Sequence, residues 1–392
     1  MKHFQYLMIG GGLAGDAAVR GIREIDTEGS IGMLSREPDP PYTRPNLSKG
    51  LWKGRTLEKI WRHTESLGAE LLLGTRVTAL DVSDKSVRDE KGDKYTFDKL
   101  LLATGGSPVR LPYGGEDIIY FRDLQDYRHL RAQTEAGDHF LVIGGSFIGS
   151  EIAAALTMVG KGVTMVFPEE AICANIFPNE LSHYLNDYYR QKGVDVLTDD
   201  TVADVEKSGS RFTVRTRSGR AFDVDGVVAG IGIRPNLELA RGSGLQVENG
   251  IVVDDRLLTS AADVFAAGDV ANFYHLALEK RVRVEHEDNA IQMGKLAGRN
   301  MAGADEPYTH IPMFYSDLFE LGYEAVGEIS SRMKTMTDWQ EPFKKGVIYY
   351  LQNDRVRGVL LWNVWDQIDQ ARALIAESAP FEAGHLKERL FP

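Results

Sequence analysis

Apolar and polar positions follow a strand, turn, helix, strand order that occurs twice along the chain. The first copy predicts a strand over 4–9, a glycine turn, a helix to about Arg23 and a strand over 30–34. The second copy predicts a strand over 139–143, another glycine turn, a helix to about Val159 and a strand over 162–167. Each copy is a βαβ unit, which normally builds a parallel sheet covered by helices. We therefore expect an α/β fold with two Rossmann-like dinucleotide-binding domains.

The rest of the chain predicts further strands that end in glycine turns, followed by a C-terminal region with a different order of strands and helices. Apolar strands entering glycine turns are predicted over 99–105, 226–232 and 260–269. From Pro312 onward the pattern predicts a small α+β domain, with strands over 323–328, 346–351 and 357–361 and a helix over about 366–377.

Composition and charge narrow the class of protein. The 392 residues carry 45 basic and 57 acidic side chains, a net charge of −12, which makes nucleic acid and anionic membrane poor partners. Cys173 is the one cysteine, so an internal disulfide and a cysteine-ligated metal centre are excluded, and we predict no metal site. No apolar run approaches the ~18 residues of a membrane span. We expect a soluble cytoplasmic protein, since no signal peptide is apparent at the N-terminus.

The first glycine turn has the spacing Gly10-x-Gly12-x-x-Gly15. The first glycine permits a tight turn, the second lets a diphosphate approach the backbone, and the third lets the helix pack closely on the strand. The helix N-terminus then presents free N–H groups to the phosphates. This context favours a dinucleotide over a chance turn. Glu37 takes the position of the ribose-binding acid, or else is a solvated loop charge.

The second turn keeps Gly144 and Gly149 but has Ser146 in place of the middle glycine. We interpret this as a tolerated variant, because the serine hydroxyl can itself donate to phosphate. The alternative is a βαβ turn with a structural role alone. Glu169 is the candidate ribose acid, and its carboxylate would repel a 2′-phosphate, which favours NADH over NADPH. Glu170 next to it is the alternative.

Two dinucleotide sites in one chain suggest FAD together with a nicotinamide nucleotide. Gly268-Asp269 follows an apolar segment, and its carboxylate could accept from the ribityl chain of FAD. The alternative is that Asp269 only caps the following helix.

These motifs together identify a resemblance. The chain resembles the FAD-dependent pyridine nucleotide reductases of glutathione reductase fold, and most closely the apoptosis-inducing factor-like and ferredoxin reductase-like members. The resemblance covers nearly the whole chain and rests on PPYTRPNLSKGLW, ATGG, GGSFIGSE, FPEE, AAGD, RVRVEHEDNA, MFYSDL and VLLWN.

The resemblance implies the organisation and the site residues. It implies an FAD-binding domain of residues 1–113 and 234–312, an NAD-binding domain of 114–233, and a C-terminal domain of 313–392. Lys49, paired with Glu151, and His286 are implied as catalytic residues. The implied FAD contacts are Gly10, Gly12, Gly15, Glu37, Arg44, Lys49, Val77, Ala103, Thr104, Gly105, Arg122, Gly268, Asp269, His286 and Tyr315. The implied NADH contacts are Gly144, Phe147, Ile148, Gly149, Glu169, Gly232, Glu285 and Glu324.

Several positions depart from the family pattern. Tyr315 replaces a tryptophan beside the flavin, Asn46 replaces a proline, Asn175 replaces a lysine and Asp366 replaces an asparagine. Phe147 and His286 also have ordinary interpretations, as a core aromatic and as a hydrogen-bonded interior histidine.

We expect an NADH-dependent flavoprotein oxidoreductase that passes hydride to FAD and electrons onward. The acceptor is unidentified: a quinone, a small one-electron acceptor or an iron–sulfur protein. A dithiol mechanism is excluded for a chain with one cysteine. The rival hypothesis is a redox-sensing interaction protein of low turnover that binds NADH and changes its oligomeric state, so the chain is predicted to be a monomer or an NADH-sensitive homodimer.

Overall fold

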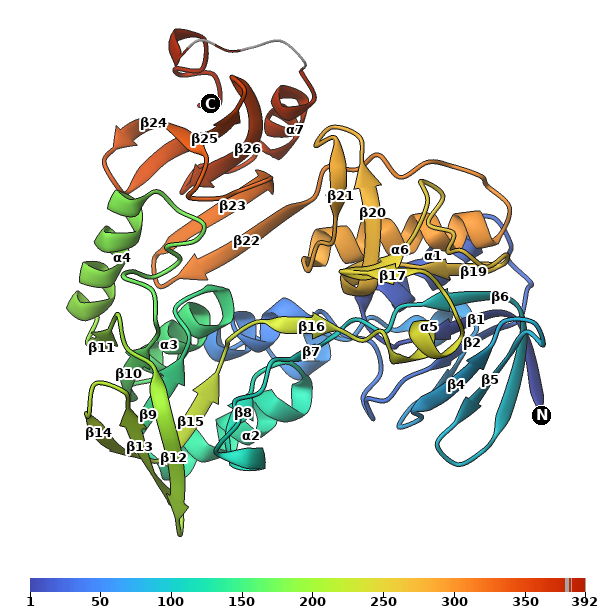
Figure 1. The fold of residues 1–392 in the computed structure, drawn as a ribbon, viewed down its shortest axis with the longest axis horizontal. Helices are drawn as coiled ribbons and strands as arrows, with labels where there is room; N and C mark the ends of the chain where they lie inside the picture. Colours follow the sequence, from blue (N-terminus) through green and yellow to red (C-terminus); the bar gives the residue numbers. More distant parts are fainter. Residues whose placement is uncertain (378–380, 382, 392) are drawn as a thin grey trace. The chain divides into compact units, whose positions relative to one another are not determined.

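The computed structural model describes residues 1–377, 381 and 383–391, and its fold is mixed α/β (Figure 1). The chain divides into two compact units. The first contains Met1–Arg44, Thr56–Ser107 and Arg234–Pro312, and the second contains Pro45–Arg55, Pro108–Ile233 and Met313–Pro392. The predicted fold class, two Rossmann-like sheets and an α+β C-terminal part, is confirmed. The predicted domain boundaries remain a prediction.

The first unit is built on a seven-stranded sheet whose central strands are parallel. Its order is β3-β2-β1-β6-β5-β4, with β19 also paired to β6. The strands are β1 (Lys2–Ile9), β2 (Ile31–Leu34), β3 (Ala69–Leu72), β4 (Val77–Asp81), β5 (Ser86–Asp89), β6 (Lys94–Leu102) and β19 (Val264–Ala266). The first predicted βαβ unit is therefore confirmed, whereas the strand predicted over 260–269 is shorter.

Two helices lie side by side in this unit, α1 (Leu13–Arg23) and α6 (Glu287–Met301) (Figure 1). A Cβ added at Gly294 would lie 2.3 Å from the carbonyl oxygen of Ala14, and one at Gly298 would lie 2.1 Å from that of Ala18. The glycines thus allow the two helix backbones to approach closely. The unit also contains α5 (Glu238–Gly242) and a sheet of β17 (Val247–Glu248), β18 (Gly250–Val252), β20 (Ala271–His275) and β21 (Lys280–Val282).

The second unit contains the second parallel sheet, of order β11-β10-β9-β15-β8. Its strands are β8 (Ile119–Tyr120), β9 (His139–Ile143), β10 (Gly162–Val166), β11 (Val194–Leu197) and β15 (Gly226–Ala229). The helices of this part are α2 (Leu124–Ala136), α3 (Phe147–Met158) and α4 (Asn179–Gln191). An antiparallel sheet of β12 (Val202–Ser208), β13 (Arg211–Thr216) and β14 (Ala221–Val224) follows. A separate pair of strands, β7 (Gly106–Pro108) and β16 (Ile233–Pro235), spans the points where the chain passes from one unit to the other.

The C-terminal part of the second unit is a five-stranded antiparallel sheet with one helix. The sheet order is β22-β23-β26-β25-β24, and the elements are β22 (Met313–Leu318), β23 (Leu321–Gly327), β24 (Lys334–Glu341), β25 (Lys345–Gln352), β26 (Arg355–Trp362) and α7 (Ile368–Ala376). Three of these strands and the helix are as predicted. The sequence pattern missed β22 and β24. Most positions of both strands are not buried, and most side chains of β24 are polar. Among the described residues, no helix is long and apolar enough to cross a membrane.

Candidate functional site

The first glycine turn, between β1 and α1, has the shape of a phosphate cradle. Gly10 has a φ of 123°, and a Cβ there would lie 2.1 Å from the carbonyl oxygen of Ala103. A Cβ at Gly15 would lie 2.3 Å from the carbonyl oxygen of Gly10. Gly12 differs, because no described residue beyond its own neighbours in the turn and helix places an atom within 4 Å of its Cβ position. It is the N-cap of α1 and supplies no side-chain cap. The turn therefore leaves open space at the helix N-terminus, which fits the diphosphate of FAD.

Glu37 is held in place near this turn. Its Oε2 accepts from the Tyr42 hydroxyl at 2.6 Å and its Oε1 accepts from the Arg44 guanidinium at 2.7 Å. The side chain is 23% exposed. Glu37 is therefore held by two side chains and is not a freely solvated loop charge, while its role as the ribose-binding acid stays a prediction.

The residues after β6 and β19 lie in the same unit. The Thr104 hydroxyl donates to the Asn236 carbonyl at 3.0 Å, Ala103 is buried, and Gly105 has a φ of 61°. Asp269 lies in a short 3₁₀ turn (Gly268–Val270) that leads into β20. No α-helix follows Asp269 directly, so the helix-cap interpretation is wrong.

His286 and Glu285 precede α6, and Val77 is buried at the start of β4. Burial lowers the pKa of His286 to about 4, although Asp269 and Asp288 oppose the shift. Glu285 pairs with Arg283 at 2.5 Å. Val77, Glu285 and His286 thus belong to the first unit, with the predicted FAD residues from Gly10 to Arg44.

The second glycine turn, between β9 and α3, repeats the geometry of the first. Gly144 has a φ of 115°, and a Cβ at Gly149 would lie 2.0 Å from the carbonyl oxygen of Gly144. Ser146 is exposed at the N-cap of α3 and makes no side-chain cap. The serine is thus accommodated without blocking the turn, which fits the dinucleotide interpretation.

The neighbours of this turn also lie in the second unit. Ile148 packs beside Gly230, where a Cβ would lie 3.2 Å from its side chain. Phe147 is half-buried and meets Phe314 edge-on, with ring centroids 5.2 Å apart. Gly232 has a φ of 94°, and in the described part of the chain no residue other than its sequence neighbours reaches within 4 Å of its Cβ position. Arg122 lies before α2, where its backbone N–H donates to Asp126 at 2.8 Å.

Two carboxylates after β10 have different surroundings. Glu169 is half-buried and accepts from the Asn175 amide at 3.4 Å. Glu170 accepts from the Asn179 amide at 2.8 Å, and His183 lies 4.0 Å from its other oxygen. Glu170 is thus engaged with α4, which leaves Glu169 as the better candidate for a ribose.

Glu324, in β23, is a carboxylate with a buried oxygen. Its Oε2 has no hydrogen-bond partner among the described residues. Burial raises the pKa of Glu324, and the charge of Asp366 adds to the shift. An unsatisfied buried acceptor is expected at a ligand site more than in a settled core.

Lys49 and Glu151 form the ion pair that the resemblance implies. The Lys49 Nζ lies 2.6 Å from Glu151 Oε1, and the side chains are 11% and 4% exposed. Glu151 also accepts from the Ser48 hydroxyl at 2.5 Å and from the Ser316 hydroxyl at 2.6 Å. Neither serine was predicted as a site residue from the sequence. The only signal for them was their place within the quoted NLSKG and MFYSDL stretches.

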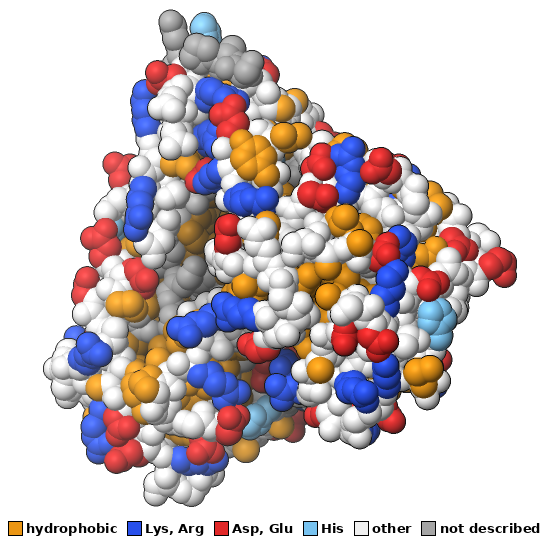
Figure 2. All heavy atoms as spheres, turned by 45° about the vertical axis from the view of Figure 1, so that its right-hand side comes forward, with side chains coloured by type: hydrophobic (Ala, Val, Ile, Leu, Met, Phe, Trp, Pro, Cys, Tyr) orange, Lys and Arg blue, Asp and Glu red, His pale blue; other side chains and the backbone are white. Residues whose placement is uncertain are grey.

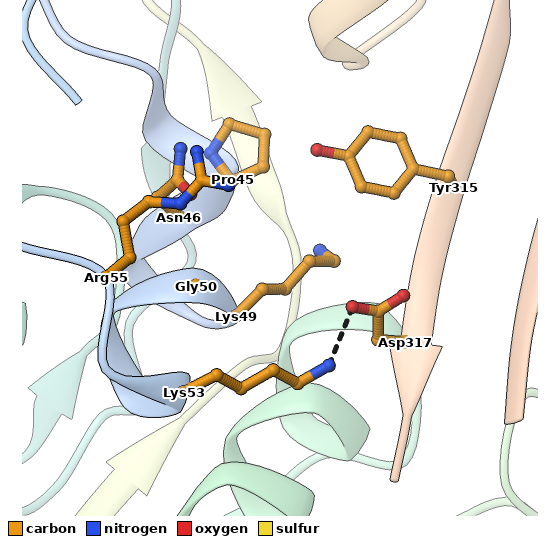
Figure 3. Close-up of a pocket in the computed structure, with 8 residues that line it drawn as sticks. All are labelled: Pro45, Asn46, Lys49, Gly50, Lys53, Arg55, Tyr315 and Asp317. Atoms are coloured by element: carbon orange, nitrogen blue, oxygen red, sulfur yellow. Dashed lines mark hydrogen bonds and ion pairs between the residues drawn. The ribbon is translucent and has the colours of Figure 1, made fainter. Parts of the chain in front are cut away.

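A cavity of about 300 Å³ opens beside this pair (Figure 3). One wall is the 45–55 segment, and the other is β22, which contributes Tyr315 and Asp317. The Lys49 Nζ lies 5.3 Å from the centre of the Tyr315 ring, which is 39% exposed. The lining residues are Pro45, Asn46, Lys49, Gly50, Lys53, Arg55, Tyr315 and Asp317.

The chain is similar to known flavoprotein reductases. Residues 4–294 match the family described as pyridine nucleotide-disulphide oxidoreductase, and residues 297–342 and 337–377 match the C-terminal part of mitochondrion-associated apoptosis-inducing factor. The chain is 34% identical to apoptosis-inducing factor 1 of Dictyostelium discoideum, over 97% of this chain and 80% of that protein. It is 31% identical to monodehydroascorbate reductase 3 of Arabidopsis thaliana, over 97% of this chain and 94% of that protein.

A solved structure is similar over almost the whole chain. It is the covalent complex of putidaredoxin reductase with putidaredoxin, with a TM-score of 0.91 and 30% identity, and the match covers 99% of this chain and 96% of that one.

Proposed function

Because the chain belongs to the pyridine nucleotide-disulphide oxidoreductase family and is an FAD-dependent NAD(P)H oxidoreductase, we propose that NADH is its preferred electron donor. The observation that carries the proposal is the setting of Glu169. Its carboxylate has the Asn175 amide as its hydrogen-bond partner, and no lysine or arginine pairs with it among the described residues. A 2′-phosphate placed there would meet a negative charge with no cation to offset it.

The test compares kcat/KM for NADH and NADPH in two matched variants. Glu169→Gln removes the negative charge, so the preference for NADH is expected to fall at least tenfold. Glu170→Gln is the control, because the Glu170 carboxylate is engaged with Asn179 and His183 on α4. A preference that changes with Glu170 and stays constant with Glu169 would contradict the assignment.

FAD, when bound, supplies the two-electron chemistry that joins a hydride donor to an electron acceptor. In this proposal the open N-terminus of α1 would hold the diphosphate, and Glu37, which is fixed by Tyr42 and Arg44, would hold a ribose. By the family resemblance Lys49 would contact the flavin, and its positive charge would offset the negative charge that added electrons bring. Glu151, with hydroxyl groups of Ser48 and Ser316, keeps the Lys49 ammonium in one position.

The acceptor is proposed to take its electrons without help from a protein thiol. Cys173 is the only cysteine of the chain and is buried. Burial, followed by the charge of Glu151, raises the pKa of its thiol to about 12, so it stays protonated at neutral pH. The relatives include a monodehydroascorbate reductase and a putidaredoxin reductase, whose names give a small organic molecule and a protein as what they reduce. Both kinds of acceptor are compatible with this proposal, as is a quinone.

A further inference from the structure

The cavity beside Lys49 carries a charge opposite to that of the chain as a whole. Three of its lining residues are cations, Lys49, Lys53 and Arg55, and one is a carboxylate, Asp317. Even when Glu151 behind Lys49 is counted, the positive charges remain in excess. The chain itself has a net charge of −12. A positive cavity in a negative chain attracts anions to one place on the protein.

Two of the three cations are available to a ligand. Lys53 lies 2.8 Å from Asp317, and these side chains are 40% and 39% exposed. An exposed pair of this kind is weak, so Lys53 can exchange Asp317 for another anion. Arg55 is exposed, and no carboxylate pairs with it among the described residues. Lys49, by contrast, is occupied by its buried pair with Glu151.

Gly50 and Tyr315 shape the cavity. A Cβ at Gly50 would lie 2.5 Å from Asn46 Oδ1 and 3.0 Å from Arg55 Nε, so glycine lets these two polar groups face the space together. Opposite them, Tyr315 presents its ring from β22 (Figure 3). A planar ligand can stack on such a ring while its charged group meets Lys53 and Arg55.

We propose that this cavity binds the electron acceptor, and that the acceptor is a small planar organic anion of the quinone class. The inference rests on the proposed function, since it names the oxidant of that reaction. NADH loses two electrons and one proton and becomes NAD⁺, while the quinone gains two electrons and two protons and becomes a hydroquinone. One of those protons comes from NADH and the other from solvent.

A small ligand fits the cavity better than a protein partner does. Its volume of about 300 Å³ lies at the lower end of the range for small-molecule sites. On the face drawn in Figure 2, basic and acidic side chains are interspersed over much of the surface. An acidic iron–sulfur protein would need a broad basic field, whereas a small anion needs only the few cations that line one cavity.

The test uses two quinones that differ in charge, 1,4-naphthoquinone-2-sulfonate and neutral 1,4-naphthoquinone, at saturating NADH. The measured quantity is kcat/KM for the sulfonated quinone divided by kcat/KM for the neutral quinone. A change in NADH binding or in flavin reduction affects both values equally and cancels in this ratio. Arg55→Gln and Lys53→Gln are each expected to lower the ratio about fivefold, as expected for one charge pair about 4 Å apart in water. Asp317→Asn is expected to raise it by a similar factor.

Control variants and a binding measurement complete the design. Arg220→Gln and Lys334→Gln remove exposed cations of the same unit outside the cavity lining, and both should leave the ratio unchanged. Isothermal titration of the FAD-loaded protein with 2-naphthalenesulfonate, which is not reduced, should show weaker binding in Arg55→Gln and tighter binding in Asp317→Asn.

Three results would overturn the inference. A ratio that is equal in all variants means that the cavity does not select the acceptor's charge. If the Lys53 and Arg55 variants lose FAD or slow its reduction by NADH with no change in the ratio, the cavity belongs to the flavin. If reduction of a plant-type ferredoxin follows these variants and the quinone ratio does not, the surface docks a protein. Failure of NADH to reduce the flavin at all would instead refute the proposed function.

Discussion

Removing Lys49 should destabilise the second unit strongly, because its partner Glu151 is only 4% exposed. Breaking one side of a buried ion pair costs about 3–5 kcal/mol, since the remaining charge stays buried without its counter-ion. Glu151 would keep the hydroxyl donors of Ser48 and Ser316, so we expect the lower end of that range for Lys49→Met, about 3 kcal/mol. For a unit of this size that corresponds to a fall in Tm of about 6–12 °C.

The assay is differential scanning calorimetry at two excess concentrations of FAD. A variant that only binds FAD more weakly recovers its Tm as FAD rises, whereas a variant with an unpaired buried charge does not. Lys53→Met is the matched control, because its pair with Asp317 is 40% and 39% exposed and worth at most about 1 kcal/mol.

The double variant Lys49→Met/Glu151→Gln separates the pair from simple packing loss. With both charges gone, the loss of Tm should be smaller than the sum of the two single losses by at least about 4 °C. Two results would refute the reasoning that the pair is buried and coupled. One is a loss of Tm in the double variant equal to the sum of the two single losses, and the other is a Lys49→Met variant with the same Tm as the Lys53→Met control.

Three other predictions test the two units. Gly12→Ala should keep the fold but weaken FAD binding at least tenfold, because its Cβ would enter the open space that the diphosphate is proposed to fill. Gly15→Ala should instead lower the Tm, because its Cβ would lie 2.3 Å from the carbonyl oxygen of Gly10. Calorimetry and FAD titration check both, and wild-type FAD affinity in Gly12→Ala would count against the cradle. Burial lowers the pKa of His286 from its ordinary value near 6.5 to about 4. Between these two pH values the unfolded chain binds a proton that the folded chain does not bind. The free energy of unfolding should therefore fall as the pH drops from about 6.5 to about 4. His286→Gln should remove this fall in melts between about pH 7 and about pH 4, and an unchanged slope would rule out the histidine as its source. Burial, followed by the charge of Asp366, raises the pKa of Glu324, so the folded chain favours the protonated carboxyl and loses stability as the pH rises. Glu324→Gln should therefore raise the Tm at neutral pH and leave it unchanged near pH 4. An equal gain in Tm at both pH values would contradict this.

The sequence predicted what is local along the chain. The two βαβ units follow from alternating apolar strands and from glycines whose role depends on neighbours a few residues away, such as Gly10 and Gly15. Strand β24 was missed because most of its side chains are polar and most of its positions are not buried. Local patterning gives no signal for such a strand, because its place is set by pairing with β25.

The contacts that build the candidate site are distant in sequence. Ser48 lies 103 residues from Glu151, Ser316 lies 165 residues from it, and Lys53 lies 264 residues from Asp317. Only the resemblance joined Lys49 to Glu151. The serines were signalled only by their place in two of the stretches that carry the resemblance, and nothing in the sequence pattern pointed to the cavity. Side chains from separate elements meet only once the tertiary fold exists, so such a site is found from the structure.

We propose that this chain oxidises NADH in preference to NADPH through FAD and transfers the electrons to an acceptor. The most direct measurement mixes the FAD-loaded protein with NADH, and separately with NADPH, under anaerobic conditions in a stopped-flow spectrometer, and then adds 1,4-naphthoquinone-2-sulfonate. We expect NADH to bleach the flavin absorbance at least tenfold faster than NADPH, and the quinone to restore the absorbance within the time of one turnover. A flavin that NADH does not bleach, or that bleaches equally fast with both nucleotides, would contradict this proposal.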